Sequence, residues 1–337
     1  MTFAARITGT GSAFPRRRLT NEDLARKVAH HGVETNDSWI RERTGISERR
    51  ISNTRNAAET NSSLGAEASL KALEMAGHRP EDVDQIIYAT CSPDTLIPST
   101  ACWLQKKIGA RKAWVVDLNA ACSGFIYGLV TAEQFVRSGH SKIVLVVGSE
   151  VLSPFINWGD RSSCILFGDG GGAAVVERVS PKSKGRILSS YLASQGDLSE
   201  LFYIPAGGSN LEITPDIYDQ QLHKMQMNGR EIFKIAVRTL TECALRTLEA
   251  RHMPVVRLDW LIPHQANLRI IEAVANRLGF PMERVLVNLD RYGNTSAATV
   301  PTALDEAVRD GRIRRGQLLL LDAFGAGLTA GAVLLRW

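Results

Sequence analysis

The segment Leu70-Lys-Ala-Leu-Glu-Met-Ala-Gly-His-Arg-Pro-Glu-Asp-Val-Asp-Gln-Ile-Ile87 returns in outline 175 residues later, as Leu245-Arg-Thr-Leu-Glu-Ala-Arg-His-Met-Pro-Val-Val-Arg-Leu-Asp-Trp-Leu-Ile262. The same offset pairs Asn119 with Asn294, Cys122 with Ala297, and the apolar run 143–146 with 318–321. A repeat this long is typical of a duplicated domain, because the units of solenoid proteins span only about 20 to 50 residues.

The spacing of apolar residues predicts that helices and strands alternate in each half. This alternation predicts an α/β fold of two similar halves, each with a mixed, mostly parallel sheet. The polar, turn-rich stretch 180–185 is the expected boundary, which gives halves of residues 1–181 and 182–337. The elements expected in the first half are helix 62–76, strand 85–89, a buried strand 113–117, helix 123–138 and strand 142–147.

The composition excludes several classes of protein. The five cysteines are odd in number and have no CxxC or CxxH spacing, which argues against a disulfide framework and a zinc site. We therefore expect a reducing, cytoplasmic location and no metal. The net charge of +5 is modest and no nucleic-acid-binding motif is visible, so no nucleic-acid partner is expected. Residues 1–9 lack a signal-peptide pattern. Asp322 and three glycines interrupt the low-charge stretch 318–335, which predicts two strands rather than a membrane span.

Cys122 stands where a strand is expected to turn into a helix. The surrounding segment, residues 117–125, reads Asp-Leu-Asn-Ala-Ala-Cys-Ser-Gly-Phe. The positive end of a helix dipole lowers the pKa of a cysteine and favours the thiolate, so this position suits a nucleophile. A packed core cysteine explains Cys122 taken alone equally well, because buried free cysteines are common.

His264 and Asn294 are singled out by the repeat. His264 ends a strand where the first copy has Ala89, and Asn294 precedes the helix equivalent to that of Cys122. Taken singly, such a histidine is more often a structural residue, and an asparagine before Thr-Ser is more often a helix cap. All three residues, however, stand at corresponding strand-to-helix edges of two related halves. We therefore expect Cys122, His264 and Asn294 to converge on one site.

Five motifs mark the chain: Asn-Ala-Ala-Cys-Ser-Gly-Phe (119–125), Phe-Gly-Asp-Gly-Gly-Gly (167–172), Pro-His-Gln-Ala-Asn-Leu-Arg (263–269), Gly-Asn-Thr-Ser (293–296) and Ala-Phe-Gly-Ala-Gly (323–327). Together they resemble the β-ketoacyl-acyl-carrier-protein synthase III family, the initiating condensing enzymes of fatty acid synthesis within the thiolase superfamily. The resemblance covers essentially the full length and implies a duplicated thiolase-like fold, layered α-β-α-β-α. Asn294 resembles the Cys-His-Asn branch of the superfamily, whereas the elongating synthases carry two histidines.

The resemblance implies a decarboxylative Claisen condensation of an acyl-CoA primer with malonyl-acyl carrier protein. Cys122 would carry the acyl group as a thioester. His264 and Asn294 would donate hydrogen bonds to the enolate that forms when the malonyl group loses carbon dioxide. The backbone N–H groups of Cys122 and Ala326 would form the oxyanion hole. No cofactor is implied, because acyl-CoA and malonyl-carrier protein are both substrates.

Further contacts are implied by the same resemblance. The family forms homodimers through the first-half sheets, so the loop that carries Ile97 would reach the partner's acyl pocket. Ala326 replaces the middle glycine of the usual Phe-Gly-Gly-Gly loop, so its backbone must suit a residue with a Cβ. A core role for Trp39, and ordinary solvated charge for Lys234 and Arg269, are the alternatives. The implied sets are CoA binding by Thr35, Trp39, Arg43 and Arg161, carrier-protein docking by Lys234 and Arg269, and an acyl pocket with Ile97 and Phe324.

Other functions match only part of this pattern. Papain-like proteases share the order Cys, His, Asn, but their cysteine lies in a Cys-Gly-Ser-Cys-Trp context near the mature N-terminus. A dinucleotide-binding enzyme needs a third glycine that Gly9-Thr-Gly11 lacks, and the glycines at 168–172 run into a strand rather than a helix. A non-catalytic partner of a condensing enzyme would lack the nucleophile. The alternative that stays open is a related condensing or acyl-transfer enzyme of secondary metabolism that uses the same three residues.

Overall fold

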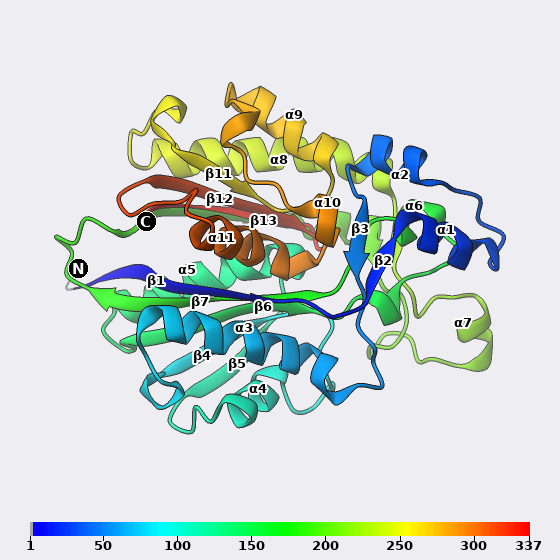
Figure 1. Ribbon diagram of the computed structural model, residues 1–337, viewed down its shortest axis with the longest axis horizontal. Coiled ribbons are helices and arrows are strands. Elements are labelled where there is room, and N and C mark those ends of the chain that lie inside the picture. The colour runs from blue at the N-terminus through cyan, green and yellow to red at the C-terminus, as the bar shows by residue number, and fades with distance from the viewer. Residues whose placement is uncertain (1–2) are drawn as a thin grey trace.

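The computed structural model describes residues 3–337 and shows two mixed β-sheets with helices between and outside them (Figure 1). The layers run α-β-α-β-α, which confirms the expected thiolase-like fold. The first sheet has the strand order β1 (Ala4–Ala13), β7 (Gly170–Val179), β6 (Ile143–Glu150), β4 (Gln85–Ala89) and β5 (Trp114–Leu118). The second has the order β11 (Trp260–Pro263), β12 (Leu318–Gly325), β13 (Thr329–Arg336) and β8 (Arg186–Ser194). The proposed boundary between residues 181 and 182 lies in the loop from β7 to β8.

The helices form three layers around these sheets. One pair covers the outer face of the first sheet, a second pair lies between the sheets, and a third covers the outer face of the second sheet. In that order the pairs are α3 (Asn61–Ala76) with α4 (Thr100–Ile108), α5 (Gly124–Arg137) with α11 (Thr299–Arg309), and α8 (Gly229–Glu249) with α9 (Leu268–Leu278).

The repeat seen in the sequence is present in the structure at the same offset. Four pairs of elements begin 175 residues apart: β4 with β11, the 3-10 turn η3 (Ala121–Ser123) with η8 (Ser296–Ala298), α5 with α11, and β6 with β12. Backbone conformation repeats as well, since Ala121 has φ 46° and Ser296 has φ 51°. Both residues therefore occupy the left-handed region, which is uncommon for residues other than glycine. The two halves share this turn as a property of the fold.

The expectation that the sheets are mostly parallel is wrong. In the first sheet β4 pairs in parallel with β5 and β6, but β1, β7 and β6 pair antiparallel. In the second sheet β11 and β12 are parallel and the other pairs are antiparallel. The physical reason is clearest at β12 and β13, which are joined by residues 326–328, because a connection that short joins only antiparallel neighbours.

The expectation of a buried strand at 113–117 is also wrong in part. β5 is the edge strand of the first sheet, and the side chains of Trp114 and Val116 are 39% and 41% exposed. Their apolar character reflects a sheet edge that this chain covers only in part, where Phe135 and His140 pack against Trp114. The stretch 318–335, in contrast, forms the two predicted strands. Among residues 3–337, no helix is both long and apolar enough to cross a membrane.

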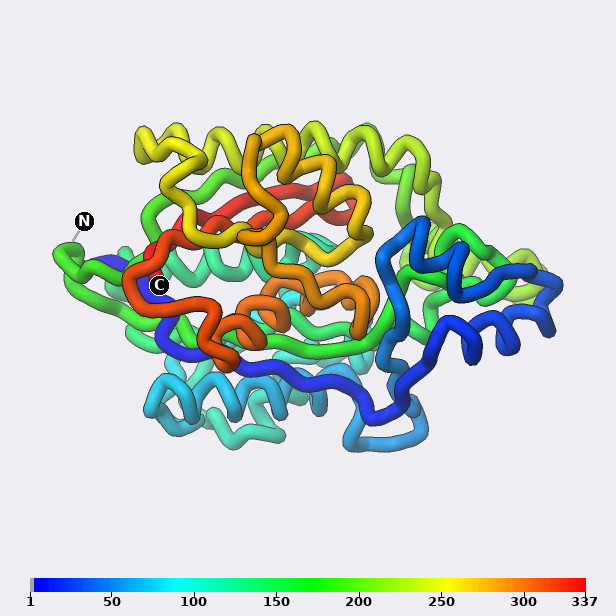
Figure 2. The backbone as a smooth tube through the Cα atoms, turned by 45° about the horizontal axis from the view of Figure 1, so that its top comes forward, coloured from blue at the N-terminus to red at the C-terminus, as the bar shows by residue number. Residues whose placement is uncertain are grey.

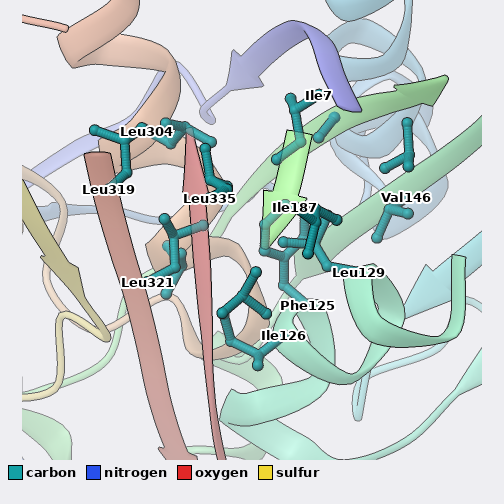
Figure 3. Close-up of a cluster of buried hydrophobic side chains, with 14 of the residues drawn as sticks. Ile7, Phe125, Ile126, Leu129, Val146, Ile187, Leu304, Leu319, Leu321 and Leu335 are labelled. Carbon is teal, nitrogen blue, oxygen red and sulfur yellow. The ribbon is translucent and has the colours of Figure 1, made fainter. Parts of the chain in front are cut away.

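A large hydrophobic core fills the space between the two sheets (Figure 3). Phe125 and Leu129 of α5 and Leu304 of α11 are at most 1% exposed there. Burying each such side chain stabilises the fold by about 1.5 to 3 kcal/mol. Because both central helices are held in this way, the residues at their N-termini are placed rigidly.

Short elements gather at the end of the molecule away from the chain termini (Figures 1 and 2). These elements are β2 (Arg18–Thr20), α1 (Asn21–Ala29), α2 (Asp37–Thr44), β3 (Glu48–Arg50), α6 (Arg161–Cys164), β9 (Phe202–Tyr203), α7 (Pro215–Asp219), β10 (Gln226–Met227) and α10 (Leu289–Tyr292).

Candidate active site

A cavity of about 1040 Å³ brings Cys122, His264 and Asn294 together. These three side chains belong to residues that are 4 to 5% exposed, so they lie at its inner end. Phe324 and Ala326 also line the cavity. Cations stand at its rim, since the lining residues Arg43, Arg230, Lys234 and Arg269 are exposed. A buried reactive end and a basic, exposed mouth therefore belong to one cavity.

Cys122 lies in η3, between β5 and α5. The turn is held by the side chain of Asn119, whose Oδ1 accepts the N–H of Ala121 at 3.2 Å. Gly325 packs on the same turn so closely that a Cβ there would lie 2.7 Å from the backbone nitrogen of Cys122. This glycine is needed because any side chain would displace the amide assigned to the oxyanion hole.

The protonation state of Cys122 differs from the expectation. Burial raises the pKa of its thiol to about 12, against the lowering expected from the helix N-terminus. The hydroxyl of Ser296 opposes this rise through a hydrogen bond, and the charge of Glu150 adds to it. The physical reason is that removal of water from the sulfur disfavours the charged form more than the nearby dipoles stabilise it. The side chain of Cys122 is therefore a neutral thiol near pH 7.

Asn294 lies in the corresponding turn of the second half. Its Oδ1 accepts the N–H of Ser296 at 2.8 Å, which repeats the contact made by Asn119. The segment is also tied to the first half, because the N–H of Asn294 donates to Leu166 O and its own carbonyl accepts from the N–H of Gly168. With Oδ1 occupied, the amide group of Asn294 presents its Nδ2 donors to the cavity.

His264 follows β11 directly. Its backbone N–H donates to the carbonyl oxygen of Asp322 at 2.8 Å, and its Nδ1 lies 2.7 Å from the hydroxyl of Thr299. Burial lowers the pKa of the imidazole to about 3, so His264 is neutral at physiological pH. With Nδ1 engaged, Nε2 is the ring nitrogen left for the cavity.

The glycine-rich motif at 167–172 is structural. Burial raises the pKa of Asp169, but its carboxylate accepts hydrogen bonds from the backbone of Ser52, Leu152 and Ser153 at 2.7 to 2.9 Å. Gly170 begins β7 directly afterwards. The motif therefore joins the loops around the cavity and has no helix behind it to bind a phosphate.

Three of the residues expected to bind CoA, Trp39, Arg43 and Arg161, lie on two short helices. Asn36 caps α2 by accepting the N–H of Trp39 at 2.9 Å, and this places Trp39 and Arg43 on one helix. Arg161, the first residue of α6, lies over the Trp39 ring at 4.4 Å, and Arg43 lies 5.7 Å from that ring. Thr35 does not line the cavity, and within the described residues its buried hydroxyl has no hydrogen-bond partner.

Ile97 does not line the cavity of its own chain. It is 89% exposed beside Leu96, which is 85% exposed, so an acyl pocket within one chain does not include it. The tertiary reason is that the described part of the chain leaves this side chain almost uncovered. Ala326, by contrast, lines the cavity, and its backbone lies outside the left-handed region, so its Cβ causes no strain.

Three polar residues near the site are not among the expected site residues, although Ser296 ends the Gly-Asn-Thr-Ser motif. Thr299 contacts His264, and Ser296 joins Cys122 to the buried carboxylate of Glu150, which accepts its hydroxyl at 3.1 Å. The repeat could have identified two of them, because polar Thr299 and Ser296 replace Gly124 and Ala121 of the first copy. Within residues 3–337, no group of three or more His, Cys, Asp or Glu side chains could hold a metal ion.

Asp322 is a buried acid directly behind His264. It is fully buried, its carboxylate oxygens have no hydrogen-bond partner among residues 3–337, and burial raises its pKa to about 8. In the unfolded chain the pKa is about 4, so between about pH 4 and pH 8 the folded chain holds a proton that the unfolded chain has lost. The free energy of unfolding therefore falls as pH rises through this range, by up to about 1.4 kcal/mol per pH unit.

We expect Asp322→Asn to remove this pH dependence. The stability of the variant relative to the unchanged chain should increase steadily from about pH 5 to pH 8, because the asparagine side chain does not titrate. Urea unfolding at several pH values across this range measures the difference. A difference that stays constant throughout would show that Asp322 is already ionised in the folded chain at the acidic end of the range.

The comparisons with known proteins agree with this geometry. Models of the 3-oxoacyl-acyl-carrier-protein synthase III family match residues 116–196, and models of its C-terminal part match residues 248–337. The chain is 51% identical to a β-ketoacyl-acyl-carrier-protein synthase III of Xylella fastidiosa, over 99% of this chain and 98% of that protein. It is 49% identical to that of Caldanaerobacter subterraneus, over 99% and 98%.

Solved structures give the same result. The crystal structure of 3-oxoacyl-acyl-carrier-protein synthase III from Aquifex aeolicus superposes with a TM-score of 0.88 at 44% identity, over 99% of this chain and 100% of that chain. The enzyme of the same name from Thermus thermophilus gives 0.87 at 41% identity, over 98% and 99%. Since a full-length sequence match, the fold and the assembled Cys-His-Asn cavity coincide, the chain belongs to the β-ketoacyl-acyl-carrier-protein synthase III family.

Proposed function

We propose that this protein condenses an acyl-CoA primer with malonyl-acyl carrier protein and so initiates fatty acid synthesis. The observation that carries the proposal is the single cavity that holds Cys122, His264 and Asn294 at its buried end and cations at its mouth. The relatives that match over the full length bear the name of this activity. They do not favour the alternative of a secondary-metabolism enzyme.

The first step is acyl transfer to Cys122. The sulfur attacks the thioester carbonyl, the new S–C bond forms as the bond to the CoA sulfur breaks, and the thiol proton leaves on CoA. Because the resting thiol is neutral, no charge has to be buried before the substrate arrives. The backbone N–H groups assigned to the oxyanion hole, those of Cys122 and Ala326, would stabilise the tetrahedral oxyanion.

The second step is decarboxylation of the malonyl thioester. Loss of carbon dioxide leaves an enolate, whose oxygen needs hydrogen-bond donors in a site without water. Asn294 has its Nδ2 group available for this purpose, because the turn occupies its Oδ1. Nε2 of His264 supplies the second donor. The enolate carbon then attacks the acyl group on Cys122, and the returning thiolate takes up one proton.

CoA binding is assigned to the Trp39 and Arg161 pair. The guanidinium already lies on the indole face at 4.4 Å, which is the geometry of a stacked cation and ring. An adenine would enter between them and stack on the indole with one face and on the guanidinium with the other. The N–H groups at the edge of the guanidinium would stay available to the phosphates.

Carrier-protein docking is assigned to the cations at the rim. Arg269 is the second residue of α9 and Lys234 lies on α8, so the two helices present positive charge on both sides of the mouth. Asn267 joins this region to the CoA region, since its Nδ2 donates to the carbonyl of Arg43 at 3.1 Å. An acidic helix carrying a phosphopantetheine arm matches this rim in charge.

A homodimer is part of the proposal. Trp114 and Val116 on edge strand β5 and the neighbouring Leu96 and Ile97 are exposed apolar side chains, which a second copy would cover. We expect a solution mass of twice 36.9 kDa, measured by sedimentation or light scattering at micromolar concentration. A monomer under these conditions would contradict the dimer and the placement of Ile97 in the partner's pocket. The cytoplasmic location stays a prediction from the cysteine pattern.

The experiment that tests the function is a panel of acyl-CoA primers of different length and branching. Each is incubated with malonyl-acyl carrier protein, and the carrier-protein products are read by mass spectrometry. We expect β-ketoacyl-carrier protein from at least one primer, two carbons longer than that primer. Acyl transfer without chain extension would favour the alternative acyl-transfer reaction.

A further inference from the structure

Thr299 is a buried residue between His264 and the turn at Ser296. It is 1% exposed and begins the central helix α11. Its Oγ1 lies 2.7 Å from Nδ1 of His264 and 2.9 Å from the carbonyl oxygen of Ser296. The first half of the repeat has Gly124 at this position and Ala89 at the position of His264. The hydroxyl and the imidazole thus occur together in one half and are both missing from the other.

The hydrogen bond to Nδ1 determines which ring nitrogen of His264 carries the proton. Because the buried imidazole is neutral, it has a single N–H. If the Thr299 hydroxyl donates to Nδ1, the proton is on Nε2 and His264 is a donor toward the cavity. If the hydroxyl instead donates to Ser296, then Nδ1 is the donor to Thr299 and Nε2 is only an acceptor.

Two observations favour the first arrangement. The hydroxyl of Thr299 can donate to the carbonyl of Ser296 at 2.9 Å, but Nδ1 of His264 lies closer at 2.7 Å, and that carbonyl keeps the backbone N–H of Thr299 as a donor when the hydroxyl proton turns to Nδ1. Asn294 is held in a similar way. The backbone N–H of Ser296 donates to its Oδ1, and its Nδ2 donors stay free. In this arrangement both side chains offer N–H groups to one cavity, which is the requirement of an enolate oxygen.

We propose that Thr299 is a positioning residue that donates its hydroxyl proton to Nδ1 of His264 and so fixes the N–H donor on Nε2. Decarboxylation is the step that uses this donor, so the assignment rests on the proposed function. Acyl transfer to Cys122 does not use it. Loss of the hydroxyl therefore affects the two half-reactions unequally.

Nitrogen-15 NMR of histidine-labelled protein tests the tautomer without any substrate. Protonated and unprotonated ring nitrogens resonate in separate ranges, and the spectrum of His264→Gln identifies the signals of His264 among the seven histidines. We expect a protonated Nε2 and an unprotonated Nδ1 in the unchanged protein. A protonated Nδ1 would overturn the proposal, and this measurement needs no folded variant of Thr299.

Kinetics of matched variants test the consequence. Thr299→Val removes the hydroxyl at nearly constant volume, and we expect decarboxylation to slow about tenfold, the effect of one lost hydrogen bond, while acylation of Cys122 is unchanged. Thr299→Ser should keep the wild-type rate and tautomer. Thr302→Val is the control, since Thr302 is also buried, one turn along α11, and its hydroxyl donates to Thr299 O rather than to His264.

These experiments distinguish failure of the positioning role of Thr299 from failure of the proposed function. Equal decarboxylation rates for Thr299→Val and Thr302→Val would overturn the positioning role. Absence of any β-ketoacyl product from the unchanged protein would instead contradict the proposed function, while the NMR result on the tautomer would stand.

Discussion

Cys122→Ser is expected to abolish the acyl-enzyme and to lower condensation at least about a thousandfold. The structure gives the reason, because burial already raises the pKa of the thiol to about 12, and a hydroxyl in the same dry position is still harder to deprotonate. Serine also changes the attacking atom without changing the turn at Ala121, whose conformation comes from the fold. Intact-mass spectrometry after incubation with acyl-CoA measures the adduct directly.

Cys91→Ser is the matched control. Cys91 is a neighbouring thiol whose Sγ lies 3.3 Å from Glu150 and 3.9 Å from Ser296, on the polar network behind Cys122. The control should acquire one acyl group as the unchanged protein does. A covalent acyl group on the Cys122→Ser protein would show that Cys122 is not the acylated residue. Loss of the adduct in Cys91→Ser would show that acylation depends on Cys91.

His264→Ala and Asn294→Ala are expected to leave acylation of Cys122 largely intact and to suppress malonyl decarboxylation by about a hundredfold or more each. Each change removes one N–H donor from the enolate, and the loss of one such donor in a dry site costs about 3 to 4 kcal/mol of barrier. The double variant should be only slightly worse than either single one, because residues that act as a unit are not additive.

Asn294→Asp separates the two roles of this residue. The aspartate keeps an oxygen to accept the N–H of Ser296, so the turn is preserved, but it has no donor for the enolate. We expect it to be as defective in decarboxylation as Asn294→Ala. The half-reactions are followed separately, by the acyl adduct on Cys122 and by carbon dioxide released from malonyl-carrier protein. A variant that loses acylation and decarboxylation in parallel would contradict the division of labour proposed here.

Much of the architecture was readable from the sequence because duplication leaves a fixed register. The starts of β4, η3, α5 and β6 recur 175 residues later, at the starts of β11, η8, α11 and β12. Local periodicity marked the helices, and the register showed which strand ends face each other. Cys122 and His264 therefore stand out as departures from the repeat, and Asn294 stands out by its place before the helix equivalent to that of Cys122.

Properties that depend on what covers a residue were not readable in this way. The run at 113–117 has the composition of a buried strand, yet β5 lies at the sheet edge with Trp114 and Val116 half-exposed. Ile97 is likewise apolar, yet it is 89% exposed outside the cavity of its own chain, and its place in a partner's acyl pocket stays a prediction. In both cases the apolar side chains predict burial, but the sequence does not tell whether the same chain buries them. The tertiary structure shows that it leaves them largely exposed.

The duplicated α/β fold, the family and the three residues at the inner end of the cavity follow from the order of residues along the chain. Their chemical state follows from tertiary contacts: burial keeps the thiol of Cys122 and the imidazole of His264 neutral, Thr299 contacts Nδ1 of His264, and the turn at Ser296 occupies Oδ1 of Asn294. The physical reason is that residue spacing fixes where a side chain starts, whereas its protonation and hydrogen bonding depend on how much water its distant neighbours exclude and which atoms they engage.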